Sequence, residues 1–126
     1  MDSQPTGQLT VRIVAMPADT NASGDIFGGW IMAQMDLSAG IAGRERARGR
    51  VVTASVSSLS FLQPVKIGDV VAVYTEVVGT GRSSIRIQIE AWVVRGTDST
   101  QLKVTEALFV MVAVDDAGAS VALPPA

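Results

Sequence analysis

The 126-residue sequence contains no cysteine and no histidine. Without cysteine the chain has no disulfide framework, which is the usual support of small exported domains. Without either residue type it cannot form a Ser-His-Asp triad, a Cys-His nucleophile or a zinc site of the usual ligands. We therefore expect no metal, and a hydrolytic site in this chain would have to use carboxylates, hydroxyl groups and backbone N–H donors.

The sequence also lacks a strong excess of either charge, with 10 Lys and Arg residues, 12 Asp and Glu residues and a net charge of −2. This balance disfavours nucleic acid or an anionic membrane as a partner. The first residues, MDSQPTGQ, have neither the basic start nor the apolar run of a secretory signal, so we expect a cytoplasmic protein. The length predicts one domain, residues 1–126, with loose tails at 1–7 and 119–126.

The longest apolar stretch, residues 26–42, contains only three polar side chains, Gln34, Asp36 and Ser38. This pattern predicts a helix that other parts of the protein cover on most sides. The polar residues in its middle and its glycines argue against a membrane span.

A loop of small and polar residues leads into this helix and places one carboxylate, Asp25, at its start. Gly28 and Gly29 follow in the first turn, where backbone N–H groups lack a partner within the helix and face an incoming oxygen. A carboxylate beside such donors is suited to acyl transfer. The alternative is that Asp25 only caps the helix, and its position by itself favours the cap, because capping is a common role of aspartate.

Five other segments have the composition of strands. The clearest is residues 85–94, where Ile85, Ile87 and Ile89 alternate with polar side chains. The predicted strands are residues 8–15, 51–62, 70–78, 85–94 and 103–114. Because one strand precedes the helix and four follow it through hairpin-length connections, we predict an α+β fold with a curved five-stranded antiparallel sheet around a long central helix.

Two basic segments each have an ordinary and a functional interpretation. The end of the predicted helix carries Arg44, Arg46, Arg48 and Arg50, where cations complement the helix dipole. We favour this interpretation over phosphate binding. The glycine-bearing segment GTGRSS at residues 79–84 is either a plain hairpin turn or, through its cation and hydroxyl groups, an anion site.

The run TNASGDIFGGWIMAQMD at residues 20–36 resembles the hot-dog-fold acyl-CoA thioesterases, and among them the small YciA-type group. Residues 49–71, 81–93 and 105–115 are also similar to successive strands of that family. The resemblance covers most of the chain and implies the hot-dog fold. Ser23 departs from the asparagine that related sequences often have there, which bears on chain-length preference.

The resemblance implies roles for individual residues. Asp25 would be the catalytic carboxylate, and backbone N–H groups around Phe27, Gly28 and Gly29 would polarise the thioester carbonyl. Asn21 and Phe27 would contact the substrate, and Arg82, Ser83 and Ser84 would bind the CoA phosphates. Asp36 lies about three helical turns after Asp25, too far to share its water, and we interpret it as a satisfied buried or interface carboxylate.

The implied activity is hydrolysis of acyl-CoA to a free carboxylic acid and CoA, in fatty acid metabolism and without a separate cofactor. One alternative is a regulatory hot-dog module that binds CoA or a nucleotide without turnover. Another is a dehydratase, which the missing histidine disfavours. We expect a homo-oligomer of dimers joined edge to edge, a hexamer as a trimer of dimers or else a dimer, because long strands leave an exposed edge.

Overall fold

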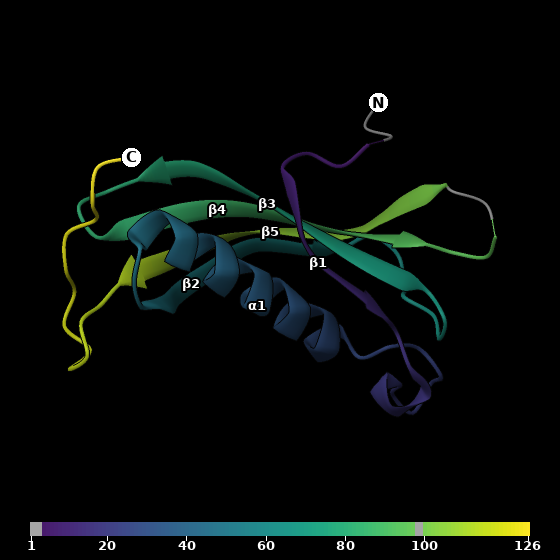
Figure 1. Ribbon diagram of the computed structural model, residues 1–126. Coiled ribbons are helices and arrows are strands. Elements are labelled where there is room, and N and C mark those ends of the chain that lie inside the picture. Colours follow the sequence, from purple (N-terminus) through teal and green to yellow (C-terminus); the bar gives the residue numbers. More distant parts are fainter. Residues whose placement is uncertain (1–3, 98–99) are drawn as a thin grey trace.

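The computed structural model describes residues 4–97 and 100–126, which form one helix packed along one face of a twisted sheet (Figure 1). The predicted hot-dog fold is confirmed, with strand ends that differ from the predicted ones by at most two residues. The elements are β1 (Gln8–Val14), the 3-10 helix η1 (Pro17–Asp19), α1 (Gly28–Ala47), β2 (Val51–Phe61), β3 (Val70–Thr80), β4 (Ser84–Val94) and β5 (Gln101–Ala113).

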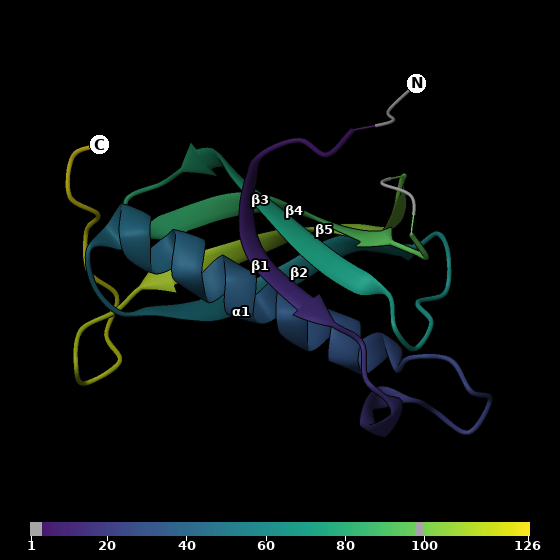
Figure 2. The same ribbon diagram turned by 45° about the vertical axis from the view of Figure 1, so that its right-hand side comes forward.

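The strand order across the sheet is β1-β3-β4-β5-β2, and all neighbouring strands are antiparallel. β1 and β2 are therefore the two edges. A view turned by 45° shows α1 running diagonally across the concave side of the sheet, with β1 crossing near its N-terminal half (Figure 2). Antiparallel order follows from the short connections between β3, β4 and β5.

The core lies between α1 and the sheet. Ile31, Met35 and Ala39 recur every fourth residue on one helix face and pack with Ile85, Ile87 and other alternate residues of β4. The prediction that α1 is covered on most sides is wrong for this chain, because the sheet reaches only one face. Leu37 is 59% exposed on the opposite face.

The edge strand β2 is almost entirely exposed along its length. Val52 and Val56 are each 38% exposed although they are apolar and β-branched. A register shift between Ser57 and Ser60, with Ser58 at φ 56°, bends the strand after its first seven residues. An open apolar edge of this kind is a surface that a second chain can pair with.

Both chain ends make contacts with the sheet or helix. Of the predicted loose tails, residues 1–3 lie outside the described residues, and Thr6 donates two hydrogen bonds to Glu90. At the other end, Leu123 N donates to Arg82 O, and Pro124 O accepts from Arg46. The C-terminal segment therefore connects the β3–β4 turn to the last turn of α1.

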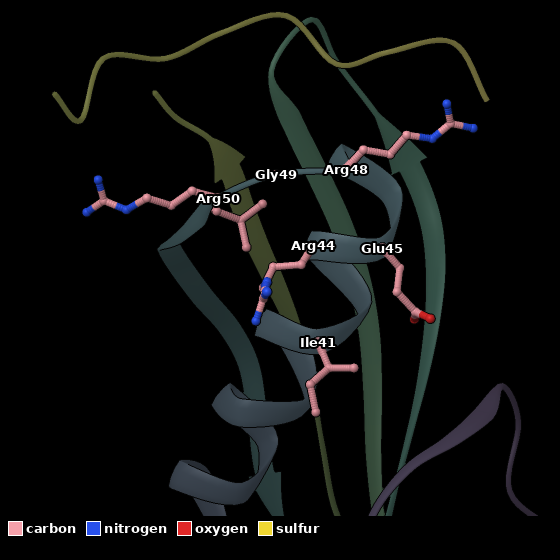
Figure 3. A pocket seen from close by; sticks show the side chains of 7 residues that line it. Ile41, Arg44, Glu45, Arg48, Gly49 and Arg50 are labelled. Atoms are coloured by element: carbon pink, nitrogen blue, oxygen red, sulfur yellow. The ribbon is translucent and has the colours of Figure 1, made fainter. Parts of the chain in front are cut away.

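Arg48, directly after the last residue of α1, takes the left-handed conformation at φ 52°. The arginines around this end border a cavity, and their side chains spread outward from the last turn and the following loop (Figure 3). The same end of the sheet holds the β3–β4 turn, since Ser83 O accepts from Ala113 N and Val51 pairs with Ala113.

Candidate active site

The loop before α1 is held by the side chain of Asn21. Its Oδ1 accepts hydrogen bonds from Ser23 N at 2.9 Å and from Asp25 N at 3.1 Å, and Asn21 N donates to Asp25 O. An asparagine that closes a turn on itself in this way replaces missing backbone partners. Asn21 therefore sets the conformation in which the loop enters the helix.

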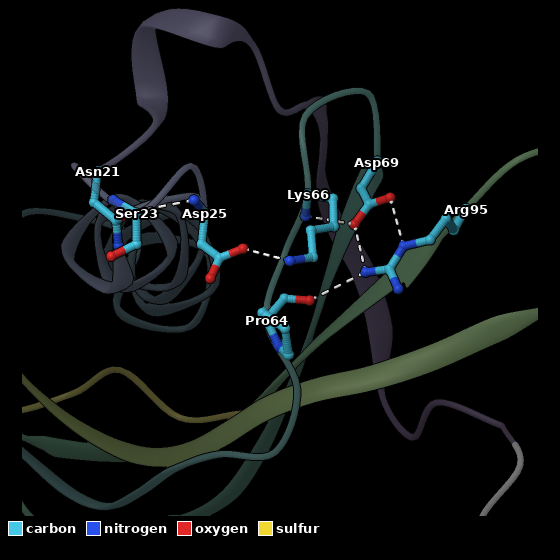
Figure 4. A network of polar contacts seen from close by, with 7 residues as sticks. All are labelled: Asn21, Ser23, Asp25, Pro64, Lys66, Asp69 and Arg95. Carbon is cyan, nitrogen blue, oxygen red and sulfur yellow. Dashed lines mark hydrogen bonds and ion pairs between the residues drawn. The ribbon is translucent and has the colours of Figure 1, made fainter.

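The carboxylate of Asp25 forms an ion pair with Lys66, with Asp25 Oδ1 2.5 Å from Lys66 Nζ (Figure 4). Lys66 N in turn donates to Asp69 Oδ2, and Asp69 pairs with Arg95. Sequence reasoning missed Lys66, which lies 41 residues from Asp25 along the chain. One oxygen of the predicted catalytic carboxylate is thus already occupied by a cation.

Asp25 is not the helix cap. The N-cap residue of α1 is Phe27, and no side chain caps this end. The capping alternative from sequence is therefore wrong, because the helix begins three residues after Asp25. Between them, Ile26 N donates a hydrogen bond to Val65 O, outside the helix.

The first turn of α1 offers two backbone donors rather than three. Phe27 N donates to Asp19 O at 2.9 Å, so this N–H is not open to a substrate, which corrects that part of the prediction. Among the described residues, Gly28 N and Gly29 N have no acceptor. The structure brings Gly28 together with Asn21 and Asp25 in one groove of about 360 Å³, and the ring of Phe61 covers Gly28 from β2.

The predicted phosphate-binding residues are at the other end of the molecule. Arg82, Ser83 and Ser84 flank the end of β5, beside the C-terminal end of α1. α1 has 20 residues and is therefore about 30 Å long. A single chain does not bring these residues to the loop that holds Asn21 and Asp25.

A second carboxylate lies on the open face of α1. Asp36 Oδ1 accepts a hydrogen bond of 2.5 Å from Thr53 Oγ1, across the gap between α1 and β2. Of the two interpretations of Asp36, a buried or an interface carboxylate, the buried one is wrong, because its side chain is exposed in this chain. The interface one stays a prediction. Within residues 4–97 and 100–126, no ion pair involves Asp36.

Asp36 and Thr53 line a groove of about 320 Å³ together with Leu37, Gly40 and Arg44. Sequence reasoning missed Thr53, although one charged residue inside an otherwise apolar helix was a signal that Asp36 needs a polar partner. The groove joins a carboxylate that forms no ion pair among the described residues to an apolar helix face, an arrangement suited to activating water beside an apolar substrate.

The described part of the chain contains neither a candidate metal site nor a candidate membrane-spanning helix. No group of three or more Asp or Glu side chains there is placed to hold a metal ion. None of the described helical segments combines the length and apolarity needed to span a bilayer.

Comparison with known proteins finds relatives that this chain matches over nearly their whole length. The Thioesterase superfamily profile matches residues 23–100. An Escherichia coli K12 protein named acyl-CoA thioester hydrolase YciA is 51% identical over 123 residues, which cover 95% of this chain and 93% of that protein.

Solved structures of related proteins have the same fold. The hexameric thioesterase y2039 from Yersinia pestis matches with a TM-score of 0.92 and 53% identity, covering 98% of this chain and 100% of that chain. An acyl-CoA hydrolase from Staphylococcus aureus, in complex with butyryl coenzyme A and coenzyme A, matches with a TM-score of 0.84 and 31% identity, covering 90% of this chain and 70% of that chain. Further structures of the Staphylococcus protein have an asparagine or a threonine changed to alanine.

Proposed function

The chain belongs to the Thioesterase superfamily, and from this premise we propose that it hydrolyses the thioester bond of acyl-CoA to a free carboxylic acid and CoA. The proposal is supported by the names of relatives that are about half identical over nearly the whole chain. Thioester hydrolysis also suits a protein without histidine or cysteine, because the carbonyl is already electrophilic and a thiolate leaves readily.

The observation that carries the proposal is that the polar groups needed for this reaction lie on two separated surfaces. Gly28 and Gly29 present backbone donors at the N-terminal end of α1, whereas Asp36 and Thr53 form a pair further along the helix. A pairing of two copies completes the site. β2 runs from Val51, beside the C-terminal end of α1, to Phe61, which covers Gly28.

Antiparallel pairing of two β2 edges would therefore place the first turn of the partner's α1 against the half of this chain that holds Asp36 and Thr53. It would also cover Val52, Val56 and the open face of α1. We expect a homohexamer built as a trimer of dimers, with a dimer as the smaller alternative. The hexameric state of the Yersinia relative supports this expectation.

In the mechanism that we propose, Asp36 takes a proton from a water molecule whose oxygen forms a bond to the thioester carbon. Thr53 fixes the orientation of the carboxylate through its hydroxyl group. The negative charge that develops on the carbonyl oxygen is stabilised by Gly28 N–H and Gly29 N–H of the other subunit. The C–S bond then breaks, and CoA leaves as a thiolate that takes up a proton.

Asp25 stays a predicted catalytic carboxylate, but its geometry supports it less. To act as a base or nucleophile it would have to do so while paired with Lys66. Asp36 has a hydrogen-bond donor and no cation beside it. The Staphylococcus structures add support for a site that contains Asn21 and Thr53. The asparagine and the threonine that were changed in that protein are separated by as many residues as Asn21 and Thr53 are in this chain.

Asp36→Asn and Asp25→Asn, assayed side by side by thiol release from acyl-CoA, distinguish the two carboxylates. Asparagine still accepts the bond from Thr53 but cannot take a proton, so Asp36→Asn should lower kcat by about 10²- to 10⁴-fold. Asp25→Asn should lower kcat by less than about tenfold, since it weakens only an exposed ion pair that positions the loop.

The reverse order of losses would return the catalytic role to Asp25 and contradict the proposed mechanism. No thiol release by the wild-type chain with any acyl-CoA, together with tight CoA binding, would instead favour the alternative function of a CoA-binding regulatory module.

A further inference from the structure

A buried carboxylate outside the proposed mechanism, that of Asp69, lies directly before β3. Its side chain is only 2% exposed, and it pairs with Arg95, which directly follows β4. Arg95 Nε lies 3.0 Å from Asp69 Oδ1, and Arg95 Nη2 lies 2.8 Å from Asp69 Oδ2. Two donors of one guanidinium group thus meet both oxygens of one carboxylate, a geometry that fixes the orientation of both groups.

The pair holds the loop that connects β2 to β3, residues 62–69. Asp69 Oδ2 also accepts a hydrogen bond from Lys66 N at 2.8 Å, and Asp69 N donates to Lys66 O at 3.1 Å. Arg95 Nη2 also donates to Pro64 O at 3.1 Å (Figure 4). Two backbone positions of the loop are therefore attached to the end of β4.

The loop in turn supports the segment that enters α1. Val65 O accepts a hydrogen bond from Ile26 N at 3.0 Å, and both of these side chains are buried. Lys66 reaches Asp25 in the same segment, although both side chains are partly exposed. The loop also forms one side of the groove that contains Gly28. The position of the loop therefore determines where the first turn of α1 begins.

The stability of the fold does not by itself account for a buried ion pair. Removing two charges from water costs about as much as their attraction returns, so such a pair contributes little net free energy of folding. Its geometric effect is greater, because a bidentate contact permits only a narrow range of positions. Catalysis needs this accuracy, since a displacement of about 1 Å at a reacting centre can lower the rate about 10²-fold.

On the basis of the proposed function, we propose that Asp69 is a positioning residue for the two backbone donors in the first turn of α1. With Arg95 it holds the loop of residues 62–69, and through the bond from Ile26 N to Val65 O the loop directs these donors at the carbonyl oxygen of the thioester. Asp69 itself does not touch the substrate.

The first test is Asp69→Asn. Asparagine has a single side-chain oxygen, so its amide group must face a donor of either Lys66 or Arg95, and the bonds on that side are lost. The backbone bonds of Asp69 with Ala15 remain, because they do not depend on the side chain. We expect kcat for acyl-CoA to fall about 10- to 100-fold. KM should change less than about threefold, because oxyanion donors meet negative charge only in the transition state.

Glu90→Gln is the matched control. Glu90 is also a buried carboxylate that accepts several hydrogen bonds, but its donors are Thr6 and Trp92 and not the loop. This variant should lose stability and leave kcat and KM nearly unchanged. Melting temperatures identify the variants that are folded under the conditions of the assay.

Variants of Arg95 test the pair from its other side. The side chain of Arg95 is 40% exposed, so its substitution removes no residue from the core. Arg95→Gln should lower kcat without a comparable change in KM. Arg95→Lys keeps a cation beside Asp69 and should restore part of the lost kcat. If Asp69→Asn is unfolded under the assay conditions, these two variants decide.

Hydrogen–deuterium exchange without substrate measures the loop contact independently of activity. Amides of residues 21–31 should exchange at least about tenfold faster in Asp69→Asn than in the wild type or in Glu90→Gln. Amides in the C-terminal half of α1 should exchange at the same rate in all three proteins.

Unchanged exchange or unchanged kcat in folded Asp69→Asn would overturn the inference and leave the proposed function intact. An equal loss of kcat in Glu90→Gln would overturn it as well, because the effect would then follow from stability alone. If the wild-type chain releases no thiol from acyl-CoA, the proposed function fails instead, and the exchange rates still decide whether Asp69 holds the loop.

Discussion

At the scale of single residues, the two glycines that begin α1 differ in their surroundings. A Cβ atom added at Gly28 would lie 3.3 Å from the ring of Phe61, whereas one added at Gly29 would meet nothing within 4 Å. The packing of the chain itself therefore does not require glycine at position 29. In the proposed site, a ligand oxygen that approaches Gly29 N–H would require it, because a side chain would stand in its way.

We predict that Gly29→Ala leaves the melting temperature unchanged or slightly higher, since alanine favours helix. The same variant keeps the backbone N–H but adds a methyl group that obstructs the approach of the carbonyl oxygen to it. We therefore expect kcat/KM for acyl-CoA to fall by about 10²-fold, as much as the loss of one oxyanion donor. Thermal denaturation and thiol release measure the two effects on the same sample. Unchanged kcat/KM would remove Gly29 from the proposed site.

At the scale of elements, the segment before β1 is attached to the sheet by hydrogen bonds from Thr6 to Glu90 of β4. This carboxylate accepts hydrogen bonds from Thr6 N, Thr6 Oγ1 and Trp92 Nε1, and Lys103 lies 3.7 Å away. Burial raises the pKa of Glu90, but the bonds from Thr6 and Trp92 and the charge of Lys103 outweigh it, so that the net pKa is below its ordinary value.

A lowered pKa in the folded state means that Glu90 contributes stability above its unfolded value of 4.5, and that this contribution is lost as the pH falls through the lower folded value. Thr6→Ala should therefore reduce the free energy of unfolding by about 1 to 3 kcal/mol at pH 7. The difference from wild type should shrink as the pH falls below 4.5 and through the lowered pKa of the folded state, where the carboxylate becomes protonated.

Denaturant unfolding at several pH values tests this prediction, with Thr10→Ala as the control. Thr10 bonds to Gln8 O and to the hydroxyl of Thr75, neither of which titrates, so its effect should not depend on pH. A Thr6→Ala effect that is constant from pH 7 to pH 3.5 would exclude Glu90 as its cause.

At the scale of the whole molecule, the site that we propose belongs to two chains. Each site would combine the Asn21 loop and first helical turn of one subunit with Asp36 and Thr53 of the other. Asp36→Asn and Asn21→Ala subunits should then both be nearly inactive alone, and should recover activity when they are co-expressed in equal amounts.

Random pairing would make half of the dimers mixed, and each mixed dimer would have one of its two sites intact. The expected recovery is therefore about one quarter of wild-type activity. No recovery, in mixed particles verified by mass, would show that each site lies within one chain. A monomer by light scattering at micromolar concentration would contradict the assembly as well.

The helix, the five strands and their antiparallel order could be predicted from the sequence because they depend on short-range patterns. Ile85, Ile87 and Ile89 alternate within one strand, and all but the first two residues of the apolar run 26–42 lie within one helix. The same local reasoning found the glycines of the first turn, and the family motif contains both of the carboxylates compared in the proposed mechanism, Asp25 and Asp36.

Only the tertiary structure decided which polar groups are occupied. The pair of Asp25 with Lys66 spans 41 residues of the chain, that of Asp36 with Thr53 spans 17, and Phe27 N is taken by a carbonyl in the preceding 3-10 turn. Such contacts depend on how the loops and strand registers place distant residues, and a one-residue change of register would separate them. The sequence by itself therefore determined the fold, whereas only the tertiary structure decided that Asp25 is paired with a cation and that Asp36 is bonded to a hydroxyl group.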